Sequence, residues 1–161
     1  KILMGCASVK ETYTDINQVR SMISASGSTH PRVELSSPGM MKVHGPGGAF
    51  NSAPPMMESW LGGVLTPTEF TDIVNQVNEG TAKAFLGTDK YFTMADVPER
   101  QQRILAHIQG EVRVLNDTYN SKGVKLAVET PQGMPKMRAR GDGNLMVRHI
   151  PFFLFITVAA Q

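Results

Sequence analysis

The chain of 161 residues is poor in the residues that build many known functional sites. Its single cysteine, Cys6, excludes an intramolecular disulfide and a zinc site built from several thiolates. Its four histidines have neither HxxxH nor HxH spacing, so we expect no metal and no other cofactor. The formal charge of +2, with no aromatic residues interleaved among Lys and Arg, argues against nucleic acid as a partner.

Long hydrophobic runs are also missing. The longest, residues 150–160, has 11 residues, about half of what a membrane-spanning helix needs. It is rich in Phe, Ile and Val and therefore predicts a buried strand. No basic start followed by an apolar stretch indicates a secretory signal.

No motif indicates a reaction. Possible carboxylate pairs have simpler roles at helix caps or on solvated helix faces, and a general acid–base assignment needs a pocket and a partner group. His107 stands beside an apolar stripe, where a lone histidine is usually a packing residue. We therefore expect no catalytic residue and no enzyme. The candidate pairs are Asp72 with Glu79 and Glu99 with Glu111.

Residues 1–63 are predicted to form an N-terminal segment and an extended arm. Ile16, Val19, Met22 and Ile23 have helical spacing, with Asp15 or Thr14 as the cap. Residues 26–63 carry five prolines and a Gly-Pro-Gly-Gly turn, so neither a helix nor a central strand is expected there.

Residues 64–161 are predicted to form a helix–helix–hairpin module. The first helix begins with a capping box, Thr66-Pro67-Thr68-Glu69, and ends at Gly80 or runs on to Gly87. Its apolar stripe is Phe70, Ile73, Val74 and Val77.

The second helix is predicted to start with a similar box, Asp96-Val97-Pro98-Glu99, and to stop within residues 116–120. Gly110 in its interior suggests close packing or a kink. Its stripe is Ile104, Leu105, Ile108, Val112 and Leu115.

The period then changes from helical to alternating. Val124, Leu126 and Val128 predict a half-buried strand, and residues 145–158 predict the strand that returns after a basic, Pro/Gly-rich loop. The expected fold class is α+β: two amphipathic helices packed on a C-terminal antiparallel hairpin, preceded by the extended arm.

Two further patterns bear on function. Met4-Gly5-Cys6 resembles the start of doubly acylated proteins, which makes Gly5 and Cys6 possible lipidation sites, although ordinary internal residues explain them more simply. We place partner binding on the helix stripe, the arm and the basic loop; the residues are Phe70, Ile73, Val77, Trp60, Arg138 and Arg140.

Residues 60–158 resemble the Golgin-A-seven/Erf-four family, which includes the cysteine-rich hydrophobic domain proteins. The similarity lies in Leu65–Phe70, in Asn75-Gln76-Val77-Asn78, in residues 111–126 and in the apolar residues 150–156. The family's long apolar segment between the two helices has no counterpart in residues 85–98. The resemblance implies a non-catalytic accessory subunit of DHHC-type protein S-acyltransferases, or a role in Golgi-to-surface traffic.

We thus expect a scaffold subunit on the cytoplasmic face of a Golgi or other endomembrane, bound to a larger membrane protein. The alternative is a structural accessory subunit of a large organellar assembly, such as a mitochondrial respiratory complex. A Pro/Gly/Met-rich arm that orders only against neighbours would suit that role.

Overall fold

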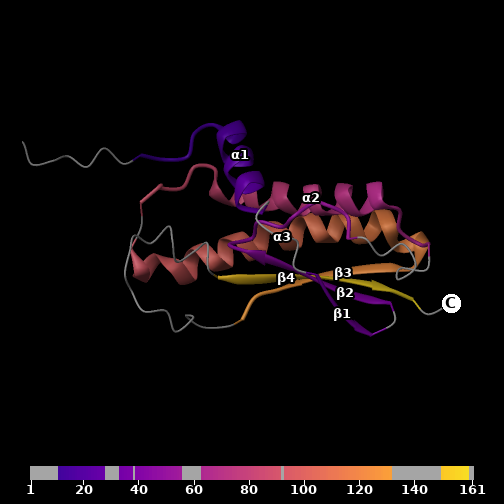
Figure 1. Cartoon of the computed structure of the whole chain (residues 1–161). Helices are drawn as coiled ribbons and strands as arrows, with labels where there is room; N and C mark the ends of the chain where they lie inside the picture. The colour runs from indigo at the N-terminus through magenta and orange to yellow at the C-terminus, as the bar shows by residue number, and fades with distance from the viewer. Residues whose placement is uncertain are drawn as a thin grey trace, which may run out of the picture.

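The computed structural model describes residues 11–27, 33–37, 39–55, 63–91, 93–131 and 150–159. Helices form one layer and strands the other, with α1 packed against α2 (Figure 1). The predicted α+β class is confirmed. The elements in chain order are α1 Ile16–Gly27, β1 Val33–Ser37, β2 Met40–Pro46, α2 Pro67–Phe85, the short 3₁₀ turn η1 Met94–Asp96, α3 Val97–Tyr119, the 3₁₀ turn η2 Asn120–Lys122, β3 Val124–Glu129 and β4 Pro151–Val158.

The described strands form one antiparallel sheet in the order β1-β2-β4-β3. The predicted hairpin supplies β3 and β4, and these two strands pair as expected. The expectation that no central strand forms within residues 26–63 is wrong, because β2 lies between β1 and β4. Met41 pairs with Ile156 and Val43 with Leu154 across the new interface.

Proline and glycine do not interrupt β2, because they stand where the sheet tolerates them. Pro46 is the last residue of the strand and lies opposite Pro151, the first residue of β4. A Cβ on Gly45 would come within 2.4 Å of the Phe50 ring, so this glycine gives room to a core aromatic. Met41 and Val43 are 0% and 1% exposed, which ties this part of the expected arm into the core.

Helix α2 follows its sequence signals closely. Glu69 N–H donates to Thr66 Oγ1 at 3.1 Å, and Thr66 N–H donates to Glu69 Oε2 at 2.9 Å, which together form the predicted capping box. The helix runs past Gly80 to Phe85, and Gly87 follows with a φ of +79°. The second of the two predicted end points is therefore correct.

Helix α3 begins at Val97 as expected, but without the predicted capping box. The Asp96 side chain makes no cap hydrogen bond to the helix. Its Oδ2 instead accepts from the backbone N–H and the hydroxyl of Thr93, at 3.0 and 3.1 Å. The Asp96 carboxylate thus caps the turn η1, which precedes α3, and is not available to cap α3 itself.

The two long helices approach each other closely at Gly80. A Cβ there would lie 3.0 Å from the carbonyl oxygen of His107 and 3.1 Å from Cα of Ile108. Gly110, which the sequence singled out for close packing, has open space around its Cα. The glycine that allows the two helices to pack closely is therefore Gly80 of α2 and not Gly110 of α3.

Candidate functional site

The structure places the predicted partner-binding stripe inside the protein. Phe70 is 2% exposed, and Ile73 and Val77 are 0% exposed, in the core between α2 and the sheet. These three assignments are corrected: the side chains hold the two layers together, and a partner cannot reach them in this fold. Trp60, Arg138 and Arg140 lie outside the described residues, as do Gly5 and Cys6.

The carboxylates that the sequence offered as pairs do not pair with each other. Glu79 of α2 binds Arg20 of α1, with Oε1 and Nη2 separated by 2.6 Å. Glu111 of α3 binds Lys83 of α2 at 2.6 Å and accepts from Gln76. Each contact joins two helices, so the carboxylates have structural roles.

These contacts shift the titration of the groups involved. Hydrogen bonding to Arg20 lowers the pKa of Glu79, and hydrogen bonding to Glu111 raises the pKa of Lys83. Glu69, at the start of α2, contacts Lys122, and this hydrogen bond lowers the pKa of Glu69. All three shifts favour the charged form of the group.

The described part of the chain contains neither a metal-binding cluster nor a membrane-spanning helix. No group of three or more His, Cys, Asp or Glu side chains there could hold a metal ion. No helix there has the length and hydropathy needed to cross a bilayer.

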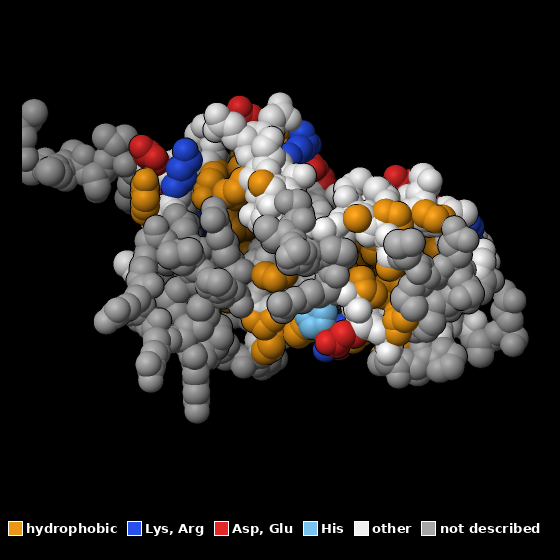
Figure 2. Space-filling model, in the orientation of Figure 1, with side chains coloured by type: hydrophobic (Ala, Val, Ile, Leu, Met, Phe, Trp, Pro, Cys, Tyr) orange, Lys and Arg blue, Asp and Glu red, His pale blue; other side chains and the backbone are white. Residues whose placement is uncertain are grey.

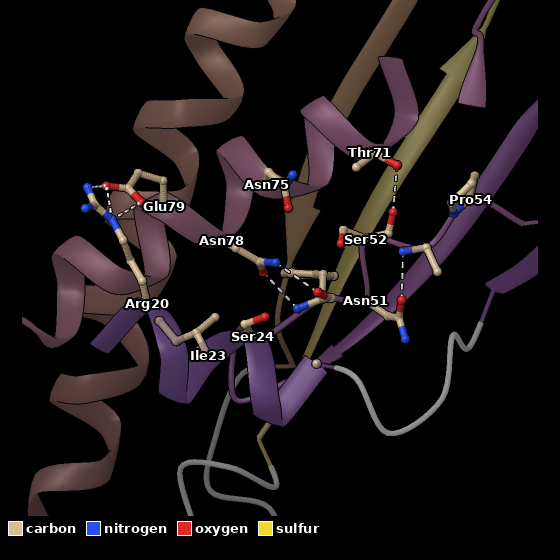
Figure 3. A pocket seen from close by; sticks show the side chains of 13 residues that line it. Arg20, Ile23, Ser24, Asn51, Ser52, Pro54, Thr71, Asn75, Asn78 and Glu79 are labelled. Atoms are coloured by element: carbon tan, nitrogen blue, oxygen red, sulfur yellow. Dashed lines mark hydrogen bonds and ion pairs between the residues drawn. The ribbon is translucent and has the colours of Figure 1, made fainter. Parts of the chain in front are cut away.

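A groove of about 670 Å³ lies between α1, residues 50–54 and α2 (Figure 3). Its wall from α1 includes Ser24, and its wall from α2 includes Asn75 and Asn78. Arg20 and Glu79, which also line it, neutralise each other. The other lining residues are uncharged, and they include both hydrogen-bonding side chains and apolar ones such as Ile23 and Pro54.

One wall of the groove is a stretch of this chain held by side chains of α2. Asn78 Nδ2 donates to the carbonyl oxygen of Phe50, and the Phe50 N–H donates to Asn78 Oδ1, both at 2.9 Å. Thr71 Oγ1 donates to the carbonyl oxygen of Ser52 at 2.9 Å, and Thr81 Oγ1 to that of Gly48 at 2.7 Å. Helix α2 thus binds the main chain of residues 48–52 in three places.

Asn75 belongs to the same row of α2 but is exposed. Its carboxamide has no hydrogen-bonding partner among the described residues. Thr71, Asn75 and Asn78 were not among the site residues expected from the sequence. A usable signal was present, because Asn and Thr are poor helix formers and recur here at positions 71, 75 and 78, on one side of α2.

A second surface lies on the side of the sheet opposite the helices. Strand β4 directs Phe152, Leu154 and Ile156 into the core, while Phe153 and Phe155 occupy the other face, half-buried. Figure 2 shows hydrophobic, histidine and acidic side chains meeting over the strands at the lower side of this view.

Charged groups from β1 and β2 surround the two phenylalanines. Lys42 Nζ lies 4.2 Å from the ring centroid of Phe153 and 5.9 Å from that of Phe155. The His44 ring meets Phe153 edge to face at 5.0 Å. Glu34 of β1 lies 3.7 Å from Lys42 and 3.2 Å from His44. We call Lys42, His44, Phe153 and Phe155 the outer-face cluster.

Comparisons with protein-family models, with curated proteins and with solved structures found no match to this chain. Its candidate sites are therefore defined by its own geometry.

Proposed function

We propose that this protein is a non-catalytic accessory subunit that binds a larger membrane-associated protein through the outer face of its sheet. The observation that carries the proposal is the composition of β4, which has large apolar side chains on both faces. An antiparallel sheet with one face in solvent usually alternates apolar with polar residues. Here the helices cover only one face (Figure 1), so Phe153 and Phe155 suit a partner on the other.

Further support comes from the ionisable groups. The interhelical ion pairs of Glu79 and Glu111 account for two carboxylates that could otherwise suggest acid–base chemistry. The resemblance to the Golgin-A-seven/Erf-four family suggests a DHHC-type protein S-acyltransferase as the partner. In that arrangement the catalytic cysteine belongs to the partner, and this chain contributes a binding surface.

The organellar alternative has less support than the sequence suggested. Its main argument was an arm that needs neighbours in order to fold. Residues 40–46 of that arm pair with β4 of the same chain. Nothing in the described residues favours this alternative over the S-acyltransferase adaptor.

The test is co-purification of the tagged full chain from solubilised membranes with co-expressed DHHC-type S-acyltransferases. Phe153→Ser should abolish retention of the enzyme, and Lys42→Ala should weaken it. Val114→Ser is the matched control, because Val114 is 55% exposed on the helical side of the protein. Circular dichroism and thermal unfolding of each variant separate loss of binding from loss of fold.

Retention of the enzyme by Phe153→Ser at the wild-type level would contradict the assignment of this face. Failure of the wild-type chain to retain any S-acyltransferase would contradict the adaptor function. Acyl transfer by the isolated chain would contradict its non-catalytic character.

A further inference from the structure

The groove between α1 and α2 has features that the outer-face cluster does not share. It is lined by side-chain amides and hydroxyls together with apolar residues such as Ile23 and Pro54, and its two charged residues, Arg20 and Glu79, are bound to each other at 2.6 Å. A ligand that fits such a lining carries both donors and acceptors and no net charge. The main chain of a peptide has this chemistry, with one N–H and one C=O per residue.

Helix α2 already binds a main chain in this way. Asn78 uses both ends of its carboxamide on one residue, Phe50, by accepting from the N–H and donating to the carbonyl oxygen (Figure 3). Thr71 binds the carbonyl oxygen two residues further on, at Ser52. These three hydrogen bonds involve only backbone groups of residues 50–52, so they do not depend on the side chains of that segment.

Asn75 presents another carboxamide on the same side of α2, and no described residue hydrogen-bonds to it. It lies one helical turn from Asn78 and from Thr71, and its exposed carboxamide lines the groove (Figure 3). Ser24 of α1 lines the same groove from the other side. A second segment lying in the groove could therefore bind Asn75 as residues 50–52 bind Asn78 and Thr71.

We propose that the groove binds an extended, uncharged peptide segment of a partner protein, with Asn75 pairing to the N–H and C=O of one peptide residue. The proposal rests on the proposed function only in taking the ligand from a partner protein. It concerns a different surface, since the outer-face cluster lies on β2 and β4 and the groove on α1 and α2.

Ser24 supplies a second hydrogen bond from the opposite wall. Ala53 and Pro54, exposed on the third wall, provide apolar contact for a peptide side chain. Recognition through the main chain with few side-chain contacts gives broad sequence tolerance, as in other complexes that bind extended peptides through backbone hydrogen bonds.

The test begins with selection of a displayed library of random linear peptides on the immobilised full chain. Selected peptides are then synthesised, and their affinities are measured by titration calorimetry. Asn75→Leu should weaken binding by about thirtyfold, because two hydrogen bonds of about 1 kcal/mol each are lost. Gln109→Leu, which changes an exposed amide on α3, is the matched control and should bind as wild type.

Peptides methylated at one backbone nitrogen give a second, sharper readout. Methylation at the residue that pairs with Asn75 should cost about tenfold in the wild type and almost nothing in Asn75→Leu. Methylation at flanking positions that face solvent should have little effect in either protein. A purely structural role of Asn75 would not produce this dependence on one peptide nitrogen.

Three outcomes would overturn the inference. They are no measurable binding of uncharged linear peptides to the wild type, equal binding to wild type and Asn75→Leu, and enrichment of charged sequences that compete with the Arg20–Glu79 pair. Its failure is distinguishable from that of the proposed function. If the wild-type chain binds no peptide but still retains an S-acyltransferase, only the peptide groove is wrong. If peptides bind but no S-acyltransferase is retained, only the adaptor function is wrong.

Discussion

Asn116 of α3 pairs with both backbone groups of Leu126 in β3. Its Nδ2 donates to the Leu126 carbonyl oxygen at 2.9 Å, and the Leu126 N–H donates to its Oδ1 at 2.8 Å. Strand β3 is at the edge of the sheet, so these groups have no neighbouring strand to bind. The side chain satisfies them and protects the edge from pairing with another chain.

Asn116→Ala should therefore destabilise the fold by about 1–3 kcal/mol, because the two Leu126 groups lose their partner at a half-buried position. Urea denaturation followed by circular dichroism measures the change. Asp117→Ala alters the adjacent exposed residue and should stay within about 0.5 kcal/mol of wild type. Equal effects of the two variants would show that the Asn116–Leu126 pair contributes little.

Gly80 and Gly110 should respond oppositely to added side chains. Gly80→Val pushes new methyl groups against the backbone of His107 and Ile108 and should cost about 1–3 kcal/mol. Gly110→Val meets open space and should be nearly neutral, within roughly 0.5 kcal/mol. Gly110→Ala should stabilise the protein by roughly 0.5–1 kcal/mol through helix propensity. Differential scanning calorimetry of the three variants tests the order.

Phe70→Ala should cost about 3–5 kcal/mol, because a fully buried aromatic side chain leaves a cavity. Leu105→Ala should cost less, since Leu105 is only half-buried at the edge of the core. Val114→Ala, on the exposed side of α3, should be close to neutral. Chemical denaturation gives the three values. Wild-type stability of the Phe70→Ala variant would contradict a core role for Phe70 and support the earlier assignment to partner binding.

Acid should weaken the contact between α1 and α2. The pKa of Glu79 is lowered below its ordinary value of 4.5 by Arg20, so the folded state holds the charged form more strongly than the unfolded state does. This contribution is fully present above about pH 4.5 and is lost as the pH falls through the lowered pKa.

Glu79→Gln should accordingly be less stable than wild type at neutral pH and should lose less stability on acidification. Thermal unfolding at several pH values between about 7 and 3 provides the comparison. Glu99→Gln, at an exposed position of α3, serves as the control and should follow the wild-type curve. Parallel curves for Glu79→Gln and wild type would show that the ion pair contributes nothing to pH-dependent stability.

Local signals predicted the elements whose formation depends on local chemistry. The capping box of Thr66, the helical stripes and the alternation of β3 each depend on residues a few positions apart, so the sequence displays them directly. The short helix near residue 16 is of this kind too: it starts beside Asp15, whose Oδ1 accepts from the Asn17 N–H at 2.9 Å.

Features that depend on distant residues could not be predicted in the same way. Gly45 and Pro46 argued against a strand, yet Gly45 is required by the Phe50 ring and Pro46 ends the strand where no hydrogen bond is needed. The alternation of Met41 and Val43 with Lys42 and His44 was the signal for β2. Its pairing partner, β4, is more than 100 residues away.

The candidate sites were harder to predict than the fold. The apolar stripe of α2 was assigned both to packing and to partner binding. Its burial in the structure favours packing, and the sequence alone does not show that burial. The groove depends on α1, residues 50–54 and α2 meeting in space, and no local pattern encodes that meeting. Phe153 and Phe155 were interpreted as part of one buried strand, because an apolar run does not reveal that the described helices cover only one of its faces.

The position of β2 between β1 and β4 also governs when the protein can fold during synthesis. Residues 40–46 leave the ribosome more than 100 residues before their partner, residues 151–157. Until then β2 has an unpaired edge, and the inner face of the sheet is incomplete. Closing a loop of this length is slow, and exposed strand edges favour aggregation, so the nascent chain is expected to depend on chaperones until β4 has emerged.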